Sequence, residues 1–289
     1  MKKKDETAGE IPMAFDLTHA RHDPTHCLAP GLFRSLKRGD RKKLKLDVTY
    51  HYGEGEQARF VGFEPLDAGD MRLLQGLIAL GGPNGIILTA DPKGDMGQQL
   101  RLFLEPKFDA AEQDGLVVRE SISKLLTEIG LTDGGDNIKS IKASLFRMSN
   151  ITVGVTKGAK QASFHLMSYA FDDADGRLFV ALNPRIAEAI LGRRPHARIE
   201  MAEVRKLETD PARLMHQRLC GWIDPGKSGK AEIDTLCGYV WPDMANDEAM
   251  KKRRQTARKA LSELVAVGWT ISEYAKGKFE IGRPKARPS

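Results

Sequence analysis

The chain has 289 residues, of which 41% are hydrophobic and 29% charged, a composition that supports one or two folded domains and excludes a fibrous or disordered protein. No apolar run is long enough to span a bilayer, and no apolar segment follows the charged N-terminus, so we expect neither membrane insertion nor secretion. The three cysteines, Cys27, Cys220 and Cys237, are too few for a disulfide framework, which favours a cytoplasmic protein.

The net charge of +6 is concentrated near the C-terminal end. Residues 251–289 hold eleven Lys and Arg against Glu263, Glu273 and Glu280, a net charge of +8 that leaves −2 for the rest of the chain. A basic segment focused in this way is typical of a protein that binds a polyanion. A solvated basic tail is the alternative.

Residues 1–65 are expected to form an N-terminal arm and a short hairpin region. Residues 1–20 are polar and match no pattern of regular structure. Residues 44–52 and 58–63 alternate loosely around Gly53-Glu54-Gly55, which indicates a β-hairpin.

Residues 66–192 combine helical periodicity with short apolar strands. A helix begins at Asp67 and ends at the Gly81–Gly85 run. The later elements are expected, in order, as a strand over 86–88, a helix over 98–104, a strand at 117–118, a helix over 122–129 capped by Ser121, a helix over 138–148, a hairpin of 151–156 and 162–170, and a strand over 178–182 after an Asp175-Gly176 turn.

Residues 193–289 repeat that order of elements. Asp210-Pro211 opens a helix, and a short strand follows at Ala231–Ile233. Asp234 is expected to cap a short helix over 235–240, which Pro242 ends. A long helix over about 248–267 and a hairpin of 269–274 and 278–281 across Lys276-Gly277 complete the chain.

Helix, short strand, capped short helix, turn, long helix and hairpin is the order of a winged helix, in which the second helix of the pair enters the major groove. The sequence therefore predicts an α+β fold of two tandem winged-helix domains. Their expected bounds are 66–192 and 193–289, and the second domain is expected to be the main DNA reader. A repeated order of elements is weaker evidence than a repeated motif.

The long C-terminal helix supplies the principal candidate DNA-binding residues. Met250, Ala257, Leu261 and Leu264 are expected to face the core. The side chains that this leaves toward solvent are Lys251, Lys252, Gln255, Arg258 and Lys259, with Arg254 at the border. Arg and Gln suit guanine and adenine edges, whereas Lys mostly contacts phosphate. A merely soluble helix face is the alternative.

The helix over 138–148 offers a second, less charged set. The same spacing exposes Asn137, Lys139, Ser140, Lys142 and Arg147, although Asn and Ser serve equally well in caps and turns. The hairpin lysines expected near phosphate are Lys157, Lys160, Lys276 and Lys278, and Arg283, Lys285 and Arg287 are expected to form a basic tail.

Gly221-Trp222-Ile223-Asp224-Pro225-Gly226-Lys227-Ser228 matches the phosphate-binding P-loop pattern. A P-loop requires a strand before it and a helix N-terminus after it, but here a helix precedes and a strand follows. Pro225 also removes one amide donor. An ATP-dependent enzyme is therefore the disfavoured reading of this segment.

Two other patterns suggest metals. His19, His22, His26 and Cys27 lack a second Cys/His pair that would complete a zinc site, and Asp172–Gly176 lacks the glutamate of a calcium loop. We expect no metal, no cofactor and no catalytic residue.

Four stretches resemble the RepC-type, iteron-binding replication initiators of IncQ plasmids, which are related to the TrfA group. They are RHDPTHCLAPGLFRSLKRG (Arg21–Gly39), QLRLFLEPK (Gln99–Lys107), DGRLFVALNP (Asp175–Pro184) and HQRLCGWIDPGKSGKAEIDTLCGYVWP (His216–Pro242). The resemblance covers nearly the whole chain after residue 20, and it includes the P-loop-like segment.

The resemblance implies a bacterial protein with two tandem winged helices that binds double-stranded DNA at direct repeats in a plasmid origin. It further implies opening of adjacent AT-rich DNA, recruitment of a plasmid helicase and primase, and a part in copy-number control. A homodimer stays open as an assembly state. A winged-helix transcriptional repressor is the alternative function.

Overall fold

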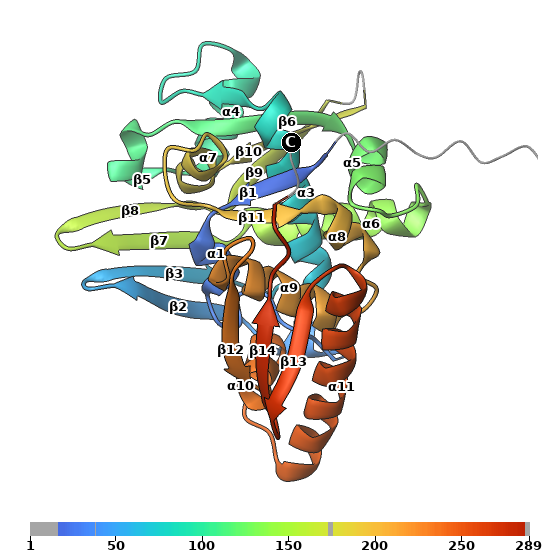
Figure 1. Ribbon diagram of the computed structural model, residues 1–289. Coiled ribbons are helices and arrows are strands. Elements are labelled where there is room, and N and C mark those ends of the chain that lie inside the picture. Colours follow the sequence, from blue (N-terminus) through green and yellow to red (C-terminus); the bar gives the residue numbers. More distant parts are fainter. Residues whose placement is uncertain (1–16, 38, 173–175, 287–289) are drawn as a thin grey trace, which may run out of the picture.

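The computed structural model describes residues 17–37, 39–172 and 176–286 and shows an α+β fold (Figure 1). Its strands are β1 (His19–His22), β2 (Leu46–Gly53), β3 (Glu56–Gly62), β4 (Ile86–Leu88), β5 (Lys107–Phe108), β6 (Gly115–Ser121), β7 (Thr152–Lys157), β8 (Lys160–His165), β9 (Met167–Asp172), β10 (Arg177–Leu182), β11 (Ala197–Glu200), β12 (Ser228–Glu232), β13 (Thr270–Ala275) and β14 (Lys278–Gly282). They pair antiparallel in the orders β1-β11, β4-β6-β10-β9, β2-β3-β7-β8-β5 and β12-β14-β13.

Helices separate and cover these sheets, and α3 is almost wholly buried. They are α1 (Pro24–Leu28), α2 (Asp40–Lys43), α3 (Ala68–Asn84), α4 (Asp95–Leu104), the 3₁₀ turn η1 (Asp109–Glu112), α5 (Ile122–Glu128), α6 (Gly135–Ser149), α7 (Pro184–Ile190), α8 (Met201–Lys206), α9 (Asp210–Trp222), α10 (Ile233–Val240) and α11 (Asp247–Ala266). The short helices α7 and α8 and the strands β1 and β11 were not among the elements expected from the sequence.

The hairpin expected from residues 44–63 is confirmed as β2 and β3, with Gly55 at a φ of 67° in the turn. It belongs to a larger sheet, because β3 also pairs with β7 from Glu56↔Lys157 to Val61↔Thr152. Its inner face carries the buried Leu46, Ala58 and Phe60.

The expectation of one strand over 162–170 is wrong. The chain divides at Leu166, whose side chain is fully buried and whose N–H donates to the Ile151 carbonyl at 2.8 Å. Before this point β8 pairs with β7, and after it β9 pairs with β10 in a different sheet. The Asp175-Gly176 turn expected between β9 and β10 falls partly outside the described residues.

Side-chain caps begin several helices, and the cap predicted at Ser121 is confirmed. Ser121 Oγ accepts from the Lys124 N–H at 3.1 Å at the start of α5, and Gly130 follows that helix with a φ of 73°. Asp67 caps α3 by accepting from the N–H groups of Gly69 and Asp70. The helix includes Pro83 and ends at Asn84, within the Gly81–Gly85 run where its stop was expected.

The C-terminal elements follow the expected order. β12 and β13 pair on either side of β14, so the hairpin and the strand that precedes the helix pair form one sheet. We expected Asp234 to cap α10. This expectation is wrong, because Glu232 occupies the N-cap position. Asp234 instead lies in the first turn and binds an arginine of α11.

The same order of elements occurs as α3, β6, α5, α6, β7 and β8, but its strands pair differently. β6 pairs with β4 and β10 and does not join the β7–β8 hairpin, whereas β12 joins the β13–β14 hairpin. The first unit has the additional β9–β10 hairpin, and β10 offers β6 six consecutive partners from Leu116 to Ser121.

Residues distant in sequence join the two halves of the chain. β1 pairs with β11 from His19↔Glu200 to His22↔Ala197. Gln75 Nε2 of α3 donates to Gln217 Oε1 of α9 at 2.7 Å in the interior. One hydrophobic cluster extends from Leu17 to Ile281, so the halves share a core.

Candidate nucleic-acid interface

Helix α11 and the β13–β14 hairpin form an exposed edge of the molecule, seen at the lower right of Figure 1. Asn246 caps α11 by accepting from the Ala249 N–H at 2.9 Å, and Asp247 and Glu248 stabilise the positive end of its dipole. Ala257, Ala260, Leu261 and Leu264 are buried against the core. This packing fixes which face of the helix meets solvent.

The opposite face of α11 is cationic. The six side chains expected there are all exposed, namely Lys251, Lys252, Arg254, Gln255, Arg258 and Lys259. Among the described residues, Lys251 and Lys259 form no ion pair, and Lys252 pairs with Glu248 at 3.2 Å one turn earlier. The predicted exposure of this face is therefore confirmed, and its contact with DNA stays a prediction.

Arg254 lies against the helix that precedes α11. Its Nε donates to Asp234 Oδ1 at 2.6 Å and its Nη2 donates to Oδ2 at 2.7 Å. The hydrogen bonds from Arg254 hold the pKa of Asp234 below its usual range. The sequence did not reveal that Arg254 pairs with Asp234, because twenty positions separate the two residues and no local pattern links them.

Arg258 is held by the hairpin. Its Nη1 and Nη2 donate to the Glu273 carboxylate of β13 at 2.6 and 2.9 Å, and its guanidinium lies 5.1 Å from the centroid of the Phe279 ring. Glu273 also accepts from the Gly277 N–H in the hairpin turn at 2.6 Å. The hydrogen bonds from Arg258 and Gly277 lower the pKa of Glu273 to about 2.

The hairpin lysines have different surroundings. Lys276 is exposed at the turn and forms no ion pair with a described residue, whereas Lys278 pairs with Glu232 at 3.4 Å. Lys230 of β12, which was not among the predicted residues, lies 5.2 Å from the centroid of the Tyr274 ring. The three strands thus carry further cations beside α11.

On α6, Lys139, Ser140 and Lys142 are exposed as expected. Lys139 lies 3.8 Å from Asp136, and Lys142 lies 5.3 Å from the centroid of the Phe171 ring. Asn137 is half-buried, and its side-chain amide donates to the Thr132 carbonyl at 2.8 Å. Asn137 therefore shapes the turn that leads into α6.

The expected exposure of Arg147 is wrong. Its side chain is 13% exposed, and Nη2 donates to Oδ1 of the fully buried Asp70 at 2.7 Å. Arg41 Nη1 also lies 3.3 Å from Oδ2 of the same carboxylate. A buried carboxylate needs such cationic partners, which draws Arg147 inward.

The hairpin of this first unit ends in Lys157 and Lys160, both exposed. Lys157 Nζ lies 2.7 Å from Glu56 Oε1 on the adjacent strand, so part of its charge is neutralised. No single surface among the described residues is shown to join these lysines to α11.

We expected Arg283 to belong to a free basic tail, and this expectation is wrong. It is buried, and its Nη1 donates to the carbonyls of Cys220 and Ile223 at 2.9 and 2.7 Å, while Nη2 donates to that of Arg198. Carbonyls at the end of α9 require a donor, and Arg283 supplies it. Lys285 is exposed, and Arg287 lies outside the described residues.

The P-loop-like segment lacks the geometry that binds phosphate. The Gly226 N–H donates to the carbonyls of Arg283 and Pro284, and the Lys227 N–H donates to that of Asp224 at 3.0 Å. Ser228 begins a strand, so no helix N-terminus follows. These amides are engaged within the protein.

The histidine cluster is part of the core. His22 and His26 are buried with ring centroids 5.7 Å apart, and burial together with His26 lowers the pKa of His22 to about 3. Among the described residues, no group of three His, Cys, Asp or Glu side chains is arranged to hold a metal ion. Of the calcium-like segment, residues 173–175 lie outside the described residues.

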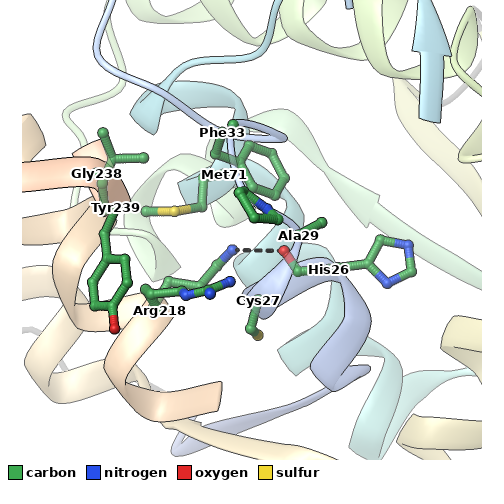
Figure 2. A pocket seen from close by; sticks show the side chains of 12 residues that line it. His26, Cys27, Ala29, Phe33, Met71, Arg218, Gly238 and Tyr239 are labelled. Carbon is green, nitrogen blue, oxygen red and sulfur yellow. Dashed lines mark hydrogen bonds between the residues drawn. The ribbon is translucent and has the colours of Figure 1, made fainter. Parts of the chain in front are cut away.

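A cavity of about 30 Å³ lies where α1, α3, α9 and α10 meet, and it is lined by Cys27, Met71, Arg218 and Tyr239 among others (Figure 2). The Arg218 guanidinium lies 4.9 Å from the centroid of the Tyr239 ring. Ligand pockets usually measure roughly 300–1,000 Å³. This cavity suits a water molecule and excludes a nucleotide.

Within the residues that the structure describes, no helix is long and apolar enough to cross a membrane. The charged exterior of α11 is the clearest feature that points to a macromolecular partner.

The family model described as Replication protein C (RepC) matches residues 14–285. No curated protein matches the chain. Two crystal structures of domains 2 and 3 of RctB are similar in fold. The first, of selenomethionine derivatives, has a TM-score of 0.54 at 12% identity and covers 90% of this chain and 98% of that chain. The second has a TM-score of 0.52 at 11% identity and covers 90% and 95%.

Proposed function

Because the chain belongs to the RepC family of replication proteins, we propose that it is a plasmid replication initiator that binds tandem repeats, or iterons, at an origin. Membership in this family implies DNA binding. The observation that carries the proposal further is the exposed cationic face of α11 beside a hairpin that bears Lys276 and Lys278. A helix and a hairpin of this kind suit a major groove and the phosphates that flank it.

In this proposal the chain contains two tandem winged-helix domains, over residues 66–192 and 193–289. α11 is the recognition helix of the second domain, with β13 and β14 as its wing. Support comes from the β12-β14-β13 sheet, which joins the wing to the strand before the helix pair. α6 plays the corresponding part in the first domain, through Lys139, Ser140 and Lys142, with Lys157 and Lys160 on the hairpin that follows.

Later steps follow from the IncQ-type resemblance of the sequence. The bound protein would promote opening of neighbouring AT-rich DNA, recruit a plasmid helicase and primase, and limit copy number by occupying the repeats. None of these steps asks the protein itself to hydrolyse a nucleotide.

The test is a footprint of the full-length protein on the origin of its own plasmid, compared with a single palindromic site. We expect regularly spaced protection across direct repeats without added nucleotide. Protection of one palindrome at a promoter would favour the repressor function instead. Equal affinity for the repeats and for unrelated DNA would refute the initiator proposal.

A further inference from the structure

The two paired arginines of α11 are held through different edges of their guanidinium groups. Arg254 meets Asp234 side-on, through Nε and Nη2. Arg258 meets Glu273 end-on, through Nη1 and Nη2. A guanidinium has five N–H donors in a fixed plane, so the edge that a carboxylate occupies decides which edge stays available.

Arg258 is tied to the hairpin from several directions. Its guanidinium lies against the Phe279 ring, and its carboxylate partner also accepts the Gly277 N–H of the turn. These contacts connect α11 to both β13 and β14. The main role of the Arg258 side chain is therefore to hold the hairpin against the helix.

Arg254 has a different geometry. Side-on pairing with Asp234 leaves the end-on pair of donors on Nη1 and Nη2 available, and the side chain is 46% exposed on the solvent face of α11. Two parallel donors on one edge match the O6 and N7 acceptors of guanine in the major groove. The carboxylate also prevents the guanidinium from rotating, because both oxygens are engaged.

We propose that Asp234 is a positioning residue that orients Arg254 to recognise one guanine of each repeat, and that Arg258 positions the wing instead of contacting a base. This inference rests on the proposed function. Charge alone gives the opposite expectation for Asp234, since a half-exposed carboxylate beside cations weakens attraction to DNA. If Asp234 acts mainly through its charge, removing the carboxylate should strengthen DNA binding. If it acts by orienting Arg254, removing it should abolish guanine recognition.

The experiment measures affinity of the full-length protein for repeat duplexes in which each guanine is replaced, one at a time, by 7-deazaguanine, which lacks the N7 acceptor. We expect the wild type to lose about tenfold or more in affinity at one guanine of the repeat. Arg254→Lys and Asp234→Asn should become nearly indifferent to that replacement. Arg258→Ala should bind more weakly overall and keep the discrimination.

Glu248→Gln is the matched control. It also removes an exposed carboxylate from this surface, but that carboxylate pairs with Lys252 and not with an arginine. It should keep the guanine preference, and Asp234→Asn should bind unrelated DNA at least as well as the wild type. Thermal midpoints within a few degrees of the wild type would show that each variant folds. If Asp234→Asn discriminates at every guanine as the wild type does, the inference is overturned and the initiator function stands. A wild type that does not prefer repeats would overturn both.

Discussion

At the scale of residues, the interior contains an ion pair that the sequence did not reveal. His216 Nε2 of α9 lies 2.7 Å from Glu203 Oε2 of α8, and both side chains are buried. Trp269 Nε1 donates to the same oxygen at 3.0 Å, and the Cys220 thiol lies 3.5 Å from His216 Nε2. Burial disfavours the charged imidazole, but Cys220 and Glu203 outweigh burial and raise the pKa of His216 to about 10.

This pair predicts a pH-dependent stability. The folded pKa of His216 lies above its ordinary value of 6.5, so its contribution is complete below about pH 6.5 and is lost as the pH rises through about 10. Urea unfolding midpoints should therefore fall over this range. Glu203→Gln should lower the free energy of unfolding at pH 7 by about 3–5 kcal/mol and flatten the dependence. An equally steep decline in the variant would show that other groups cause it.

Close packing and backbone conformation explain why glycine occupies positions 221 and 226 of the P-loop-like segment. A Cβ on Gly221 would lie 2.6 Å from that of Cys27, where α9 meets α1, and Gly226 has a φ of 77°. Gly221→Ala should therefore lower the free energy of unfolding by about 1–3 kcal/mol through overpacking.

Lys227 is the contrasting position in that segment, because its side chain is exposed. Lys227→Ala should change stability by less than about 0.5 kcal/mol, as measured by urea denaturation. Titration with ATP should give no binding signal for either protein. Binding by the wild type that disappears in this variant would restore the P-loop hypothesis.

Sequence periodicity identified which side chains of α11 face solvent, but it could not identify what pairs with an arginine. Arg147 and Asp70 are separated by 77 positions, and Arg283 meets a carbonyl 63 positions away. Helical spacing predicts a direction for a side chain. A long, flexible arginine then follows the nearest unpaired carboxylate or carbonyl, which only the tertiary structure supplies.

At the scale of elements, the exposed cations of α11 are of two kinds. Lys251 and Lys259 form no ion pair within the described chain, whereas Lys252, Arg254 and Arg258 each face a carboxylate. Phosphate binding by an unpaired lysine releases counterions without first breaking a protein ion pair. The two unpaired lysines should therefore dominate the salt dependence.

Binding to repeat DNA should weaken as salt rises, with log K falling by about 0.9 per log unit of salt for each phosphate neutralised. Lys251→Ala or Lys259→Ala should each reduce that slope by about one unit and weaken binding to all sequences alike. Lys93→Ala, an exposed lysine in the loop between β4 and α4, serves as the control and should leave the slope unchanged. A slope near zero for the wild type would refute the electrostatic account.

Elements with periodic apolar residues or a recognisable cap were predictable from the sequence, including α3, α5, α6, α9, α11 and the hairpin of β13 and β14. β1 was not, because a four-residue strand of sequence HARH has no alternating apolar pattern. The sequence also could not show which strands pair with one another in each sheet. The break at Leu166 depends on two different partner strands, and neither is local in the sequence.

At the scale of the whole molecule, the two halves are built around one interior. The β1–β11 pair, the Gln75–Gln217 hydrogen bond and the contact of α1 with α9 all connect residues more than 140 positions apart. A shared hydrophobic cluster favours cooperative unfolding. The two winged-helix domains proposed above would thus unfold together.

The tryptophans offer a direct test of that coupling, since Trp222, Trp241 and Trp269 all lie in the last third of the chain. Their fluorescence reports on the C-terminal half, whereas far-ultraviolet circular dichroism reports on every helix. We expect both signals to give the same thermal midpoint. Midpoints several degrees apart would indicate that the halves unfold independently.

The pairing of β1 with β11 also bears on how the protein is made. Residues 19–22 leave the ribosome long before residues 197–200 exist, and at about 5–20 residues per second the delay is roughly 10–35 s. During that interval the backbone donors and acceptors of the first strand have no native partner. The nascent chain is therefore exposed to capture by chaperones, and slowing translation should lengthen that exposure.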